Sequence, residues 1–295
     1  MVIVKLMGGL GNQMFQYAAA RRLAHFNNTS LKIDLSWFDN ICEVDSSRVY
    51  ALDKLAIQEN FATRTEIDVL TFKTQRTFER LITKAIGRKP SVSSSYFREK
   101  YFHFNSDILY LDGDVYLDGY WQSEKYFEDI ETIIRKEFTI KSEMNVKSLE
   151  IEKKIKSINS VSLHIRRGDY VSNPNTNQIH GSCDLKHYFR CVKSLVRRVK
   201  HPHFFVFSDE PKWTRANFKL PYPTTFIDHN PPERGHEDLK LMSQCKHHII
   251  ANSSFSWWGA WLSNNPDKII FAPKKWFNSV DYNTRDLIPG EWLKI

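Results

Sequence analysis

The chain has 295 residues, of which 26% are charged and 14% aromatic, and its formal net charge is +8. This length suits two domains or one large one, and the basic charge favours an anionic partner such as nucleic acid, a membrane surface or a nucleotide substrate. The four cysteines show neither CxxC nor zinc-finger spacing, which argues against a zinc site and against a disulfide scaffold. The absence of a signal peptide and of a long apolar run predicts a cytoplasmic protein without membrane spans.

The first 35 residues predict a strand, a glycine loop, a helix and a second strand, the usual opening of a nucleotide-binding α/β unit. A Walker A loop is excluded because Asn12 and Gln13 follow Gly11 where Lys and Ser or Thr are needed. The dinucleotide fingerprint is incomplete because Met14 stands at its third glycine position, although Asp34 lies where a ribose-binding acid would.

Gly9 and Gly11 have no side chains, and the side-chain amides of Asn12 and Gln13 follow them. This loop therefore suits a ligand that approaches the main chain closely and accepts hydrogen bonds.

Residues 65–89 form a basic amphipathic segment, which suits either an anionic bilayer surface or a core helix with a solvated basic face. Residues 110–122 predict short strands and turns. Asp112-Gly113-Asp114 within them fits the Asp-x-Asp pattern of some divalent-metal sites, but Asp-Gly is first of all a turn signal.

The most informative stretch is Val161–Tyr170, in which apolar and polar residues alternate as in a half-buried strand and then give way to two arginines. Arginine offers a charged, planar fork of donors that suits phosphate oxygens, and ligands of open α/β sheets bind beyond the carboxyl ends of the strands. We therefore expect a phosphate or diphosphate site at Arg166. The alternative is a surface strand end at which Arg166 or Arg167 pairs with Asp169.

Residues 141–160 are rich in Lys, Glu and Ser and predict a domain boundary with a polar helix. Strands and helices then alternate, which predicts a parallel, doubly wound sheet. After the strand at 246–251, small hydroxyl residues at 252–256 occupy a strand-to-helix turn, where free N–H groups and the helix dipole favour an anion. Serine N-caps alone also explain such residues.

Four stretches together resemble the family 11 glycosyltransferases, the bacterial and animal α-1,2-fucosyltransferases. They are Gly8–Tyr17, His164–Asp169, Phe207–Trp213 and Asp238–Trp261. The resemblance implies an α/β GT-B architecture of two Rossmann-like domains facing a cleft. Residues 1–150 would form the acceptor-side domain and 151–295 the GDP-fucose-binding domain, with the last 20 or so residues able to pack back on the first. It implies no metal and no cofactor.

Position by position, the resemblance makes Arg166 the diphosphate-binding arginine, with His164 beside the nucleotide, and makes Asp238 the guanine-reading carboxylate. It assigns the phosphate loop to Ser253, Ser254 and Phe255, and the first domain's ligand-facing loop to Gly9, Gly11, Asn12 and Gln13. Arg166, Asn12 and Asp169 are the expected catalytic residues. The base that accepts the proton of the attacking hydroxyl is left open among Asp169, His180 and Asp34, and Asp169 is equally suited to orienting an arginine.

The function implied is inverting transfer of fucose from GDP-fucose to the 2-hydroxyl of a terminal galactose in a bacterial surface glycan. The expected partners are GDP-fucose and a galactose-terminated or lipid-linked glycan, with peripheral contact of the protein at the inner membrane and no nucleic-acid partner. Three other functions compete with it: a transferase for another GDP-sugar, a non-catalytic nucleotide- or sugar-binding protein, and a basic nucleic-acid-binding protein. The spread of Lys and Arg over both halves argues against nucleic-acid binding.

Overall fold

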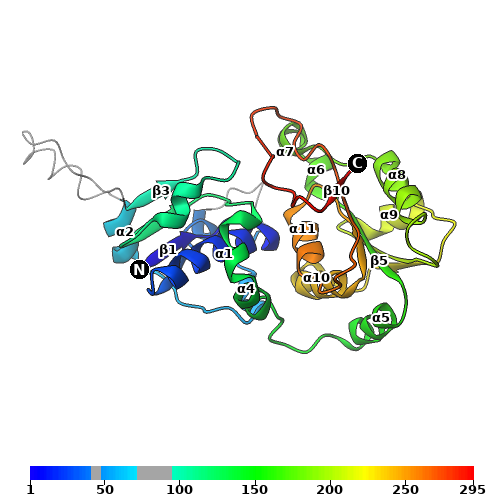
Figure 1. The fold of residues 1–295 in the computed structure, drawn as a ribbon, viewed down its shortest axis with the longest axis horizontal. Helices are drawn as coiled ribbons and strands as arrows, with labels where there is room; N and C mark the ends of the chain where they lie inside the picture. The colour runs from blue at the N-terminus through cyan, green and yellow to red at the C-terminus, as the bar shows by residue number, and fades with distance from the viewer. Residues whose placement is uncertain (41–47, 72–94) are drawn as a thin grey trace, which may run out of the picture. The chain divides into compact units, whose positions relative to one another are not determined.

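The computed structural model describes residues 1–40, 48–71 and 95–295, apart from the side chains of Asn40, Asp169, Ser172 and Asn175. The chain divides into two compact units, drawn in Figure 1: Met1–Asp53 with Ile57–Glu137, and Lys54–Ala56 with Phe138–Ile295. Residues 138–150, which the sequence analysis assigned to the first domain, thus belong to the second unit. No helix in the described ranges is long and apolar enough to cross a membrane.

The first unit is built on a four-stranded sheet of order β2-β1-β4-β3, in which every pairing is parallel. The strands are β1 (Val2–Lys5), β2 (Leu31–Asp34), β3 (Tyr96–Arg98) and β4 (Val115–Asp118). The helices α1 (Leu10–Phe26), α2 (Arg64–Thr71) and α4 (Glu131–Glu137) accompany them, together with the short turns η1 (Phe38–Asn40), η3 (Leu52–Lys54), η4 (Ser106–Tyr110), η5 (Glu124–Tyr126) and η6 (Glu128–Ile130). Leu70 of α2 packs with Ile3 and Tyr116 on the sheet. The remainder of the basic segment 65–89, from residue 72 onward, lies outside the described residues.

The second unit carries a six-stranded parallel sheet of order β10-β9-β8-β5-β6-β7. Its strands are β5 (Ser160–Ile165), β6 (His203–Ser208), β7 (Thr224–Ile227), β8 (His247–Ile249), β9 (Ile270–Ala272) and β10 (Leu293–Lys294). Its helices are α5 (Val146–Ser157), α6 (Gly168–Ser172), α7 (Pro174–His180), α8 (Leu185–Leu195), α9 (Pro211–Asn217), η7 (Pro232–Arg234), α10 (Gly235–Gln244) and α11 (Ser254–Trp261). The expected doubly wound arrangement is confirmed, because each face of the sheet has its own core: Leu163 packs with α8, and Phe205 packs with α5 and α10.

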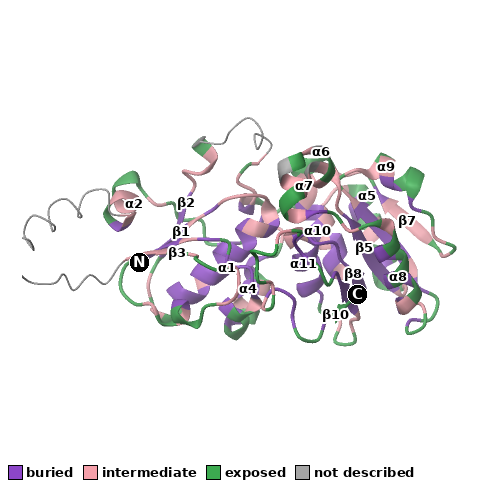
Figure 2. Ribbon diagram, turned by 90° about the horizontal axis from the view of Figure 1, so that it is seen from above, coloured by how far each residue is buried: buried purple, intermediate pink, exposed green. Residues whose placement is uncertain are grey.

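The central strand β5 is buried along its whole length rather than half-buried, as Figure 2 shows by its colour. The expectation was wrong because β5 lies between β8 and β6 and is covered on both faces, as strands of parallel sheets usually are. One of its polar residues, Ser162, has a partner inside the unit: its Oγ lies 2.8 Å from His248 Nδ1. Burial, more than neighbouring charges, lowers the pKa of His248 to about 3, so this histidine is neutral in the folded protein.

The last residues of the chain belong to the second unit. Strand β10 pairs with β9, and the Ile295 amide donates to the Ala272 carbonyl over 2.9 Å. The ring centroids of Trp292 and Trp257 lie 5.4 Å apart. The sequence analysis missed β9 and the edge strand β10 because they are only three and two residues long.

Candidate functional site

Arg166 stands immediately beyond the carboxyl end of β5, where the sequence predicted a cationic site. Its Nη1 lies 3.1 Å from Asp209 Oδ2, and its guanidinium carbon lies 5.3 Å from the ring centroid of Tyr170. The side chain stays 21% exposed, so the guanidinium fork is held in place and still reaches the surface. Asp209 beyond β6 is therefore an ion-pair partner of Arg166, while the side chain of Asp169 lies outside the described residues.

Arg167 has a different environment. Its Nε lies 3.0 Å from Glu210 Oε2, and its guanidinium carbon lies 3.4 Å from the ring centroid of Trp213. Its main-chain amide donates to Asp209 Oδ1 over 3.0 Å. Asp209 thus fixes both the Arg166 side chain and the loop behind it, a role that the sequence analysis missed although Asp209 follows an obvious strand.

His164 lies within β5, two residues before Arg166, and is 4% exposed. Its Nδ1 is buried and finds no hydrogen-bond partner in the described part of the chain. Burial, with a smaller contribution from the Arg166 charge, lowers the pKa of His164 to about 3. The ring is therefore neutral, with a buried nitrogen whose hydrogen-bonding capacity a ligand would satisfy.

The loop between β8 and α11 brings Ser253, Ser254 and Phe255 to the same sheet edge. Asn252 anchors this loop, because its Nδ2 donates to the carbonyls of His180, Gly181 and Trp276 over 3.0–3.1 Å. Ser253 stands at the N-cap of α11, but its side chain makes no capping hydrogen bond to the described helix. The capping alternative is therefore not realised. The Phe255 ring centroid lies 5.6 Å from that of His164, which places this loop beside the end of β5.

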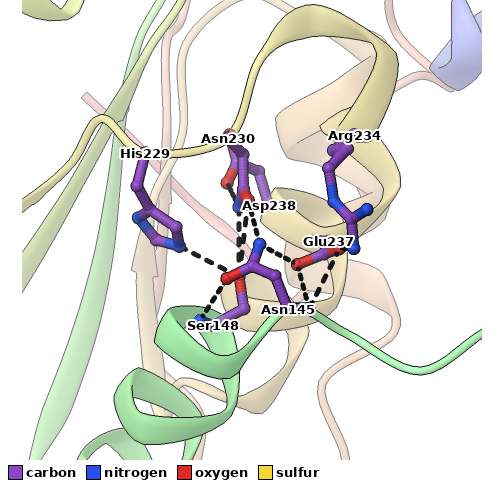
Figure 3. A network of polar contacts seen from close by, with 7 residues as sticks. All are labelled: Asn145, Ser148, His229, Asn230, Arg234, Glu237 and Asp238. Atoms are coloured by element: carbon purple, nitrogen blue, oxygen red, sulfur yellow. Dashed lines mark hydrogen bonds and ion pairs between the residues drawn. The ribbon is translucent and has the colours of Figure 1, made fainter.

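Asp238 lies in the first turn of α10, within the polar network drawn in Figure 3. Its Oδ1 accepts from Asn230 Nδ2 over 2.7 Å. Asn230 Oδ1 accepts from Asn145 Nδ2, also over 2.7 Å, and Asn145 Nδ2 lies 2.7 Å from the buried Glu237. Glu237 pairs in addition with Arg234. The sequence analysis did not identify this network around Asp238. The polar residues that follow β7 were the sequence signal that pointed to it.

Burial raises the pKa of Asp238 to about 7, with a smaller contribution from the negative charge of Glu237. The hydrogen bond from Asn230 acts in the opposite direction, because it stabilises the charged carboxylate. Asp238 is therefore poised between its neutral and charged forms near neutral pH. A ligand that donates hydrogen bonds to this carboxyl group would favour the charged form.

In the first unit, the glycine loop leads directly into α1. Gly8 has a φ of 74°, and a Cβ there would lie 2.6 Å from Asn12 Nδ2, so this tight turn requires glycine. Asn12 Oδ1 accepts from Gln122 Nε2 over 2.9 Å. A Cβ on Gly9, the N-cap of α1, would lie 3.1 Å from Arg48 Nη1, and Gly11 is buried.

Gln13, expected to face a ligand, is instead fully buried. Its Nε2 donates to the carbonyls of Gly8 and Val49, and its Oε1 accepts from the Ala51 amide, all within 2.8–2.9 Å. This amide therefore ties the segment 49–51 to the glycine loop. The buried Gln13 side chain therefore stabilises the conformation of the glycine loop from within the unit.

The structure also bears on the candidate bases. Asp34 is 1% exposed and accepts hydrogen bonds from Ser36 and from the Tyr116 hydroxyl, so an acceptor hydroxyl cannot reach it. The His180 ring stacks on Tyr170 at 5.0 Å between centroids. Asp169 belongs to α6, and its side chain is outside the described residues.

The Asp-x-Asp triplet of the first unit forms a turn. Gly113 at its centre has a φ of 70°, and Asp114 pairs with the amino group of Met1. Among the described residues, no three His, Cys, Asp or Glu side chains come together as a metal-binding group.

Two parallel sheets flanked by helices define a GT-B glycosyltransferase fold. A crystal structure of NodZ α-1,6-fucosyltransferase soaked with GDP-fucose shares it, with a TM-score of 0.51 over 92% of this chain and 94% of that chain at 14% identity. The family is equally clear: residues 1–295 match Glycosyl transferase family 11, and the chain belongs to it. This confirms the family that the motifs predicted.

Two relatives show how the family extends. The chain is 38% identical to an Escherichia coli protein named α-1,2-colitosyltransferase, over 100% of this chain and 98% of the relative. It is 26% identical to mouse galactoside α-(1,2)-fucosyltransferase 1, over 90% of this chain and 64% of the relative.

Proposed function

We propose that the protein is an inverting galactoside α-1,2-fucosyltransferase that moves fucose from GDP-fucose to the 2-hydroxyl of a terminal galactose in a bacterial surface glycan. The observation that carries the proposal is the group formed by Arg166, His164 and the Ser253–Phe255 loop at one edge of the second sheet. This group offers a fixed cation, a neutral buried nitrogen and a helix N-terminus in a chain of this family.

The mechanism follows from where charge develops. Breaking the bond between fucose C1 and the phosphate oxygen leaves negative charge on GDP and positive charge on the sugar ring. Donors that are already oriented toward the diphosphate lower this barrier without reorganisation, and the Asp209 pair keeps Arg166 oriented. Attack by the galactose hydroxyl from the opposite face inverts the configuration, and its proton passes to a base or to solvent.

The donor sugar is tested by comparing GDP-fucose with GDP-colitose, because colitose is fucose without its 3-hydroxyl. A site built to bond that hydroxyl rejects the sugar lacking it by about 10⁴-fold, whereas a site built for the deoxy sugar rejects an added hydroxyl by only about 10²-fold. We expect kcat/KM for GDP-fucose to exceed kcat/KM for GDP-colitose by about 10⁴-fold. A preference for GDP-colitose would instead make the protein a colitosyltransferase, as the E. coli relative is named.

Transfer is expected to proceed at an unchanged rate in EDTA, since Arg166 supplies the charge that a metal would otherwise bring to the diphosphate, and Asp114 is occupied by the Met1 amino group. The measurement is fucose transfer after dialysis against the chelator. Activity that is lost and then restored by manganese would contradict the proposal and would return Asp112 and Asp114 to the candidate site.

The remaining parts of the proposal concern location and partners. We place the protein in the cytoplasm, in peripheral contact with the inner membrane where a lipid-linked acceptor would lie, and assign it no nucleic-acid partner. The basic segment 65–89, which motivates the membrane contact, lies largely outside the described residues.

A further inference from the structure

The turn Gly119–Gln122, which follows β4 in the first unit, has an unusual backbone. Trp121 has a φ of 54° although it is a bulky residue with 1% exposure. Side chains of this size rarely adopt a left-handed conformation, and such residues persist only where their surroundings hold them. Outliers of this kind cluster at ligand sites, which prompts the question of what holds this one and what it presents.

Glu99, directly after β3, holds the turn. Its Oε2 accepts from the Tyr120 amide over 2.7 Å, and its Oε1 accepts from the Trp121 amide over 3.1 Å. Gly119 permits this approach, because a Cβ there would lie 2.4 Å from Glu99 Cβ. One carboxylate thus satisfies two successive main-chain amides.

Removal from water disfavours the charged form of the Glu99 carboxylate. Burial raises the pKa of Glu99 to about 7, although the two amide hydrogen bonds favour its charged form. Glu99 nevertheless directs its carboxylate at two successive main-chain amides of this turn, and this contact fixes the turn in its unusual conformation.

The turn presents groups suited to a sugar. Gln122 donates from Nε2 to Asn12 Oδ1 over 2.9 Å, which links the turn to the start of α1. Gln122 is 7% exposed, whereas Tyr120 is 38% exposed, and an exposed aromatic ring is a common surface for a sugar ring. Both Asn12 and the turn follow carboxyl ends of neighbouring parallel strands, β1 and β4, where ligands of such sheets bind.

We propose that the Gly119–Gln122 turn, together with Asn12, forms the binding subsite for the galactoside acceptor, and that Glu99 is the positioning residue that fixes this subsite. The inference rests on the proposed function and deepens it, because it assigns the acceptor to named residues of the first unit. Glu99 acts through the turn and does not contact the sugar.

The test uses variants that disturb the turn in different ways. Glu99→Gln replaces one acceptor oxygen by an amide that cannot accept from a main-chain N–H, and Gly119→Ala displaces Glu99 sterically. Tyr120→Ala removes the exposed ring without touching either hydrogen bond. Each is expected to raise the KM for a galactoside acceptor about 10-fold or more, since misplacing a binding group by about 1 Å is enough for losses of that size.

The KM for GDP-fucose and the thermal shift caused by GDP should stay at wild-type values, because the residues proposed to bind the donor, such as Arg166 and Asp238, belong to the second unit. Two control variants match the changes made. Glu131→Gln alters an exposed pair with Arg135 on α4, and Gly290→Ala adds a Cβ where nothing lies within 4 Å. Both should keep wild-type acceptor KM values.

The outcomes separate the inference from the proposed function. If the three turn variants lower only the melting temperature and leave the acceptor KM unchanged, the turn is merely structural and the inference is overturned while fucose transfer stands. If the wild-type protein transfers fucose to no galactoside, the proposed function fails first and the inference fails with it.

Discussion

Replacing Arg166 by lysine should lower kcat for fucose transfer by about 10²–10³-fold, nearly as much as replacing it by alanine. Lysine keeps a positive charge but loses the planar fork that can bond two diphosphate oxygens while facing Asp209. The expected loss corresponds to about 2.7–4 kcal/mol, the usual effect of removing one oriented donor from a developing oxyanion. Initial rates at saturating GDP-fucose give the comparison directly.

Arg167 supplies the matched control, since it belongs to the same loop but is bound to Glu210 and Trp213. Arg167→Lys should lower the melting temperature and change kcat much less. Equal losses of kcat in the two lysine variants would mean that the loop as a whole, and not the Arg166 fork, supports transfer. A near wild-type rate for Arg166→Lys would remove the fork from the mechanism.

Asp238→Ala should weaken GDP binding by about 10–100-fold and leave ADP binding nearly unchanged. A carboxylate accepts from both N1–H and the 2-amino group of guanine, a pattern that adenine cannot supply, and charge-assisted bonds of this kind contribute about 1.5–3 kcal/mol. Calorimetry with both nucleotides on wild type and variant measures the ratio. An unchanged GDP-to-ADP ratio with a lower melting temperature would show that Asp238 only supports α10 and its network.

The pH dependence of binding provides a second readout for the same residue. Because the pKa of Asp238 is raised to about 7, a growing fraction of the carboxyl is neutral below neutral pH. The ratio of GDP affinity to ADP affinity should therefore fall as the pH decreases from 8 to 6, and this change in the ratio should disappear in Asp238→Asn. The ratio is the right measure because the terminal phosphates of both nucleotides, with a pKa of about 6, titrate in the same window.

The main strands of the second unit could be predicted from the sequence because local residue patterns indicate them. The alternating pattern of β5, the apolar run of β6 and the arginines after β5 could be recognised without knowledge of distant contacts. The pairing of Arg166 with Asp209, in contrast, requires β5 and β6 to be neighbours in register, with Ile165 opposite Ser208. That register is a property of the sheet, and no local pattern in the sequence encodes it.

Residues whose surroundings come from distant parts of the chain are hard to interpret from the sequence for the same reason. Gln13 looked like a ligand-facing amide because its neighbours are glycines, yet its partners Val49 and Ala51 lie more than 35 positions away. Glu99 gave no signal at all in the sequence, because its importance comes from a turn that follows a different strand. Long-range hydrogen bonds decided both cases, and a single sequence does not reveal them.

Two buried histidines and two partly buried carboxyls give the folded protein an unusual response to acid. His164 and His248 stay neutral in the fold down to a pH of about 3, so across the window from 6.5 to 3 only the unfolded chain gains their protons. Asp238 and Glu99 have folded pKa values of about 7 against ordinary values of 3.8 and 4.5, so between those limits the fold gains their protons first.

For these four groups, proton uptake by the folded and unfolded states nearly balances between about pH 4.5 and 6.5, and the free energy of unfolding changes little there. Below about pH 4.5, only the two histidines among these four groups still bind fewer protons in the folded than in the unfolded state. Their contribution to the free energy of unfolding therefore falls as the pH decreases further. Mild acid therefore protonates the carboxyls that we propose read the donor and hold the acceptor turn, without a net loss of stability from these four groups. The resulting inactivation should reverse when neutrality is restored.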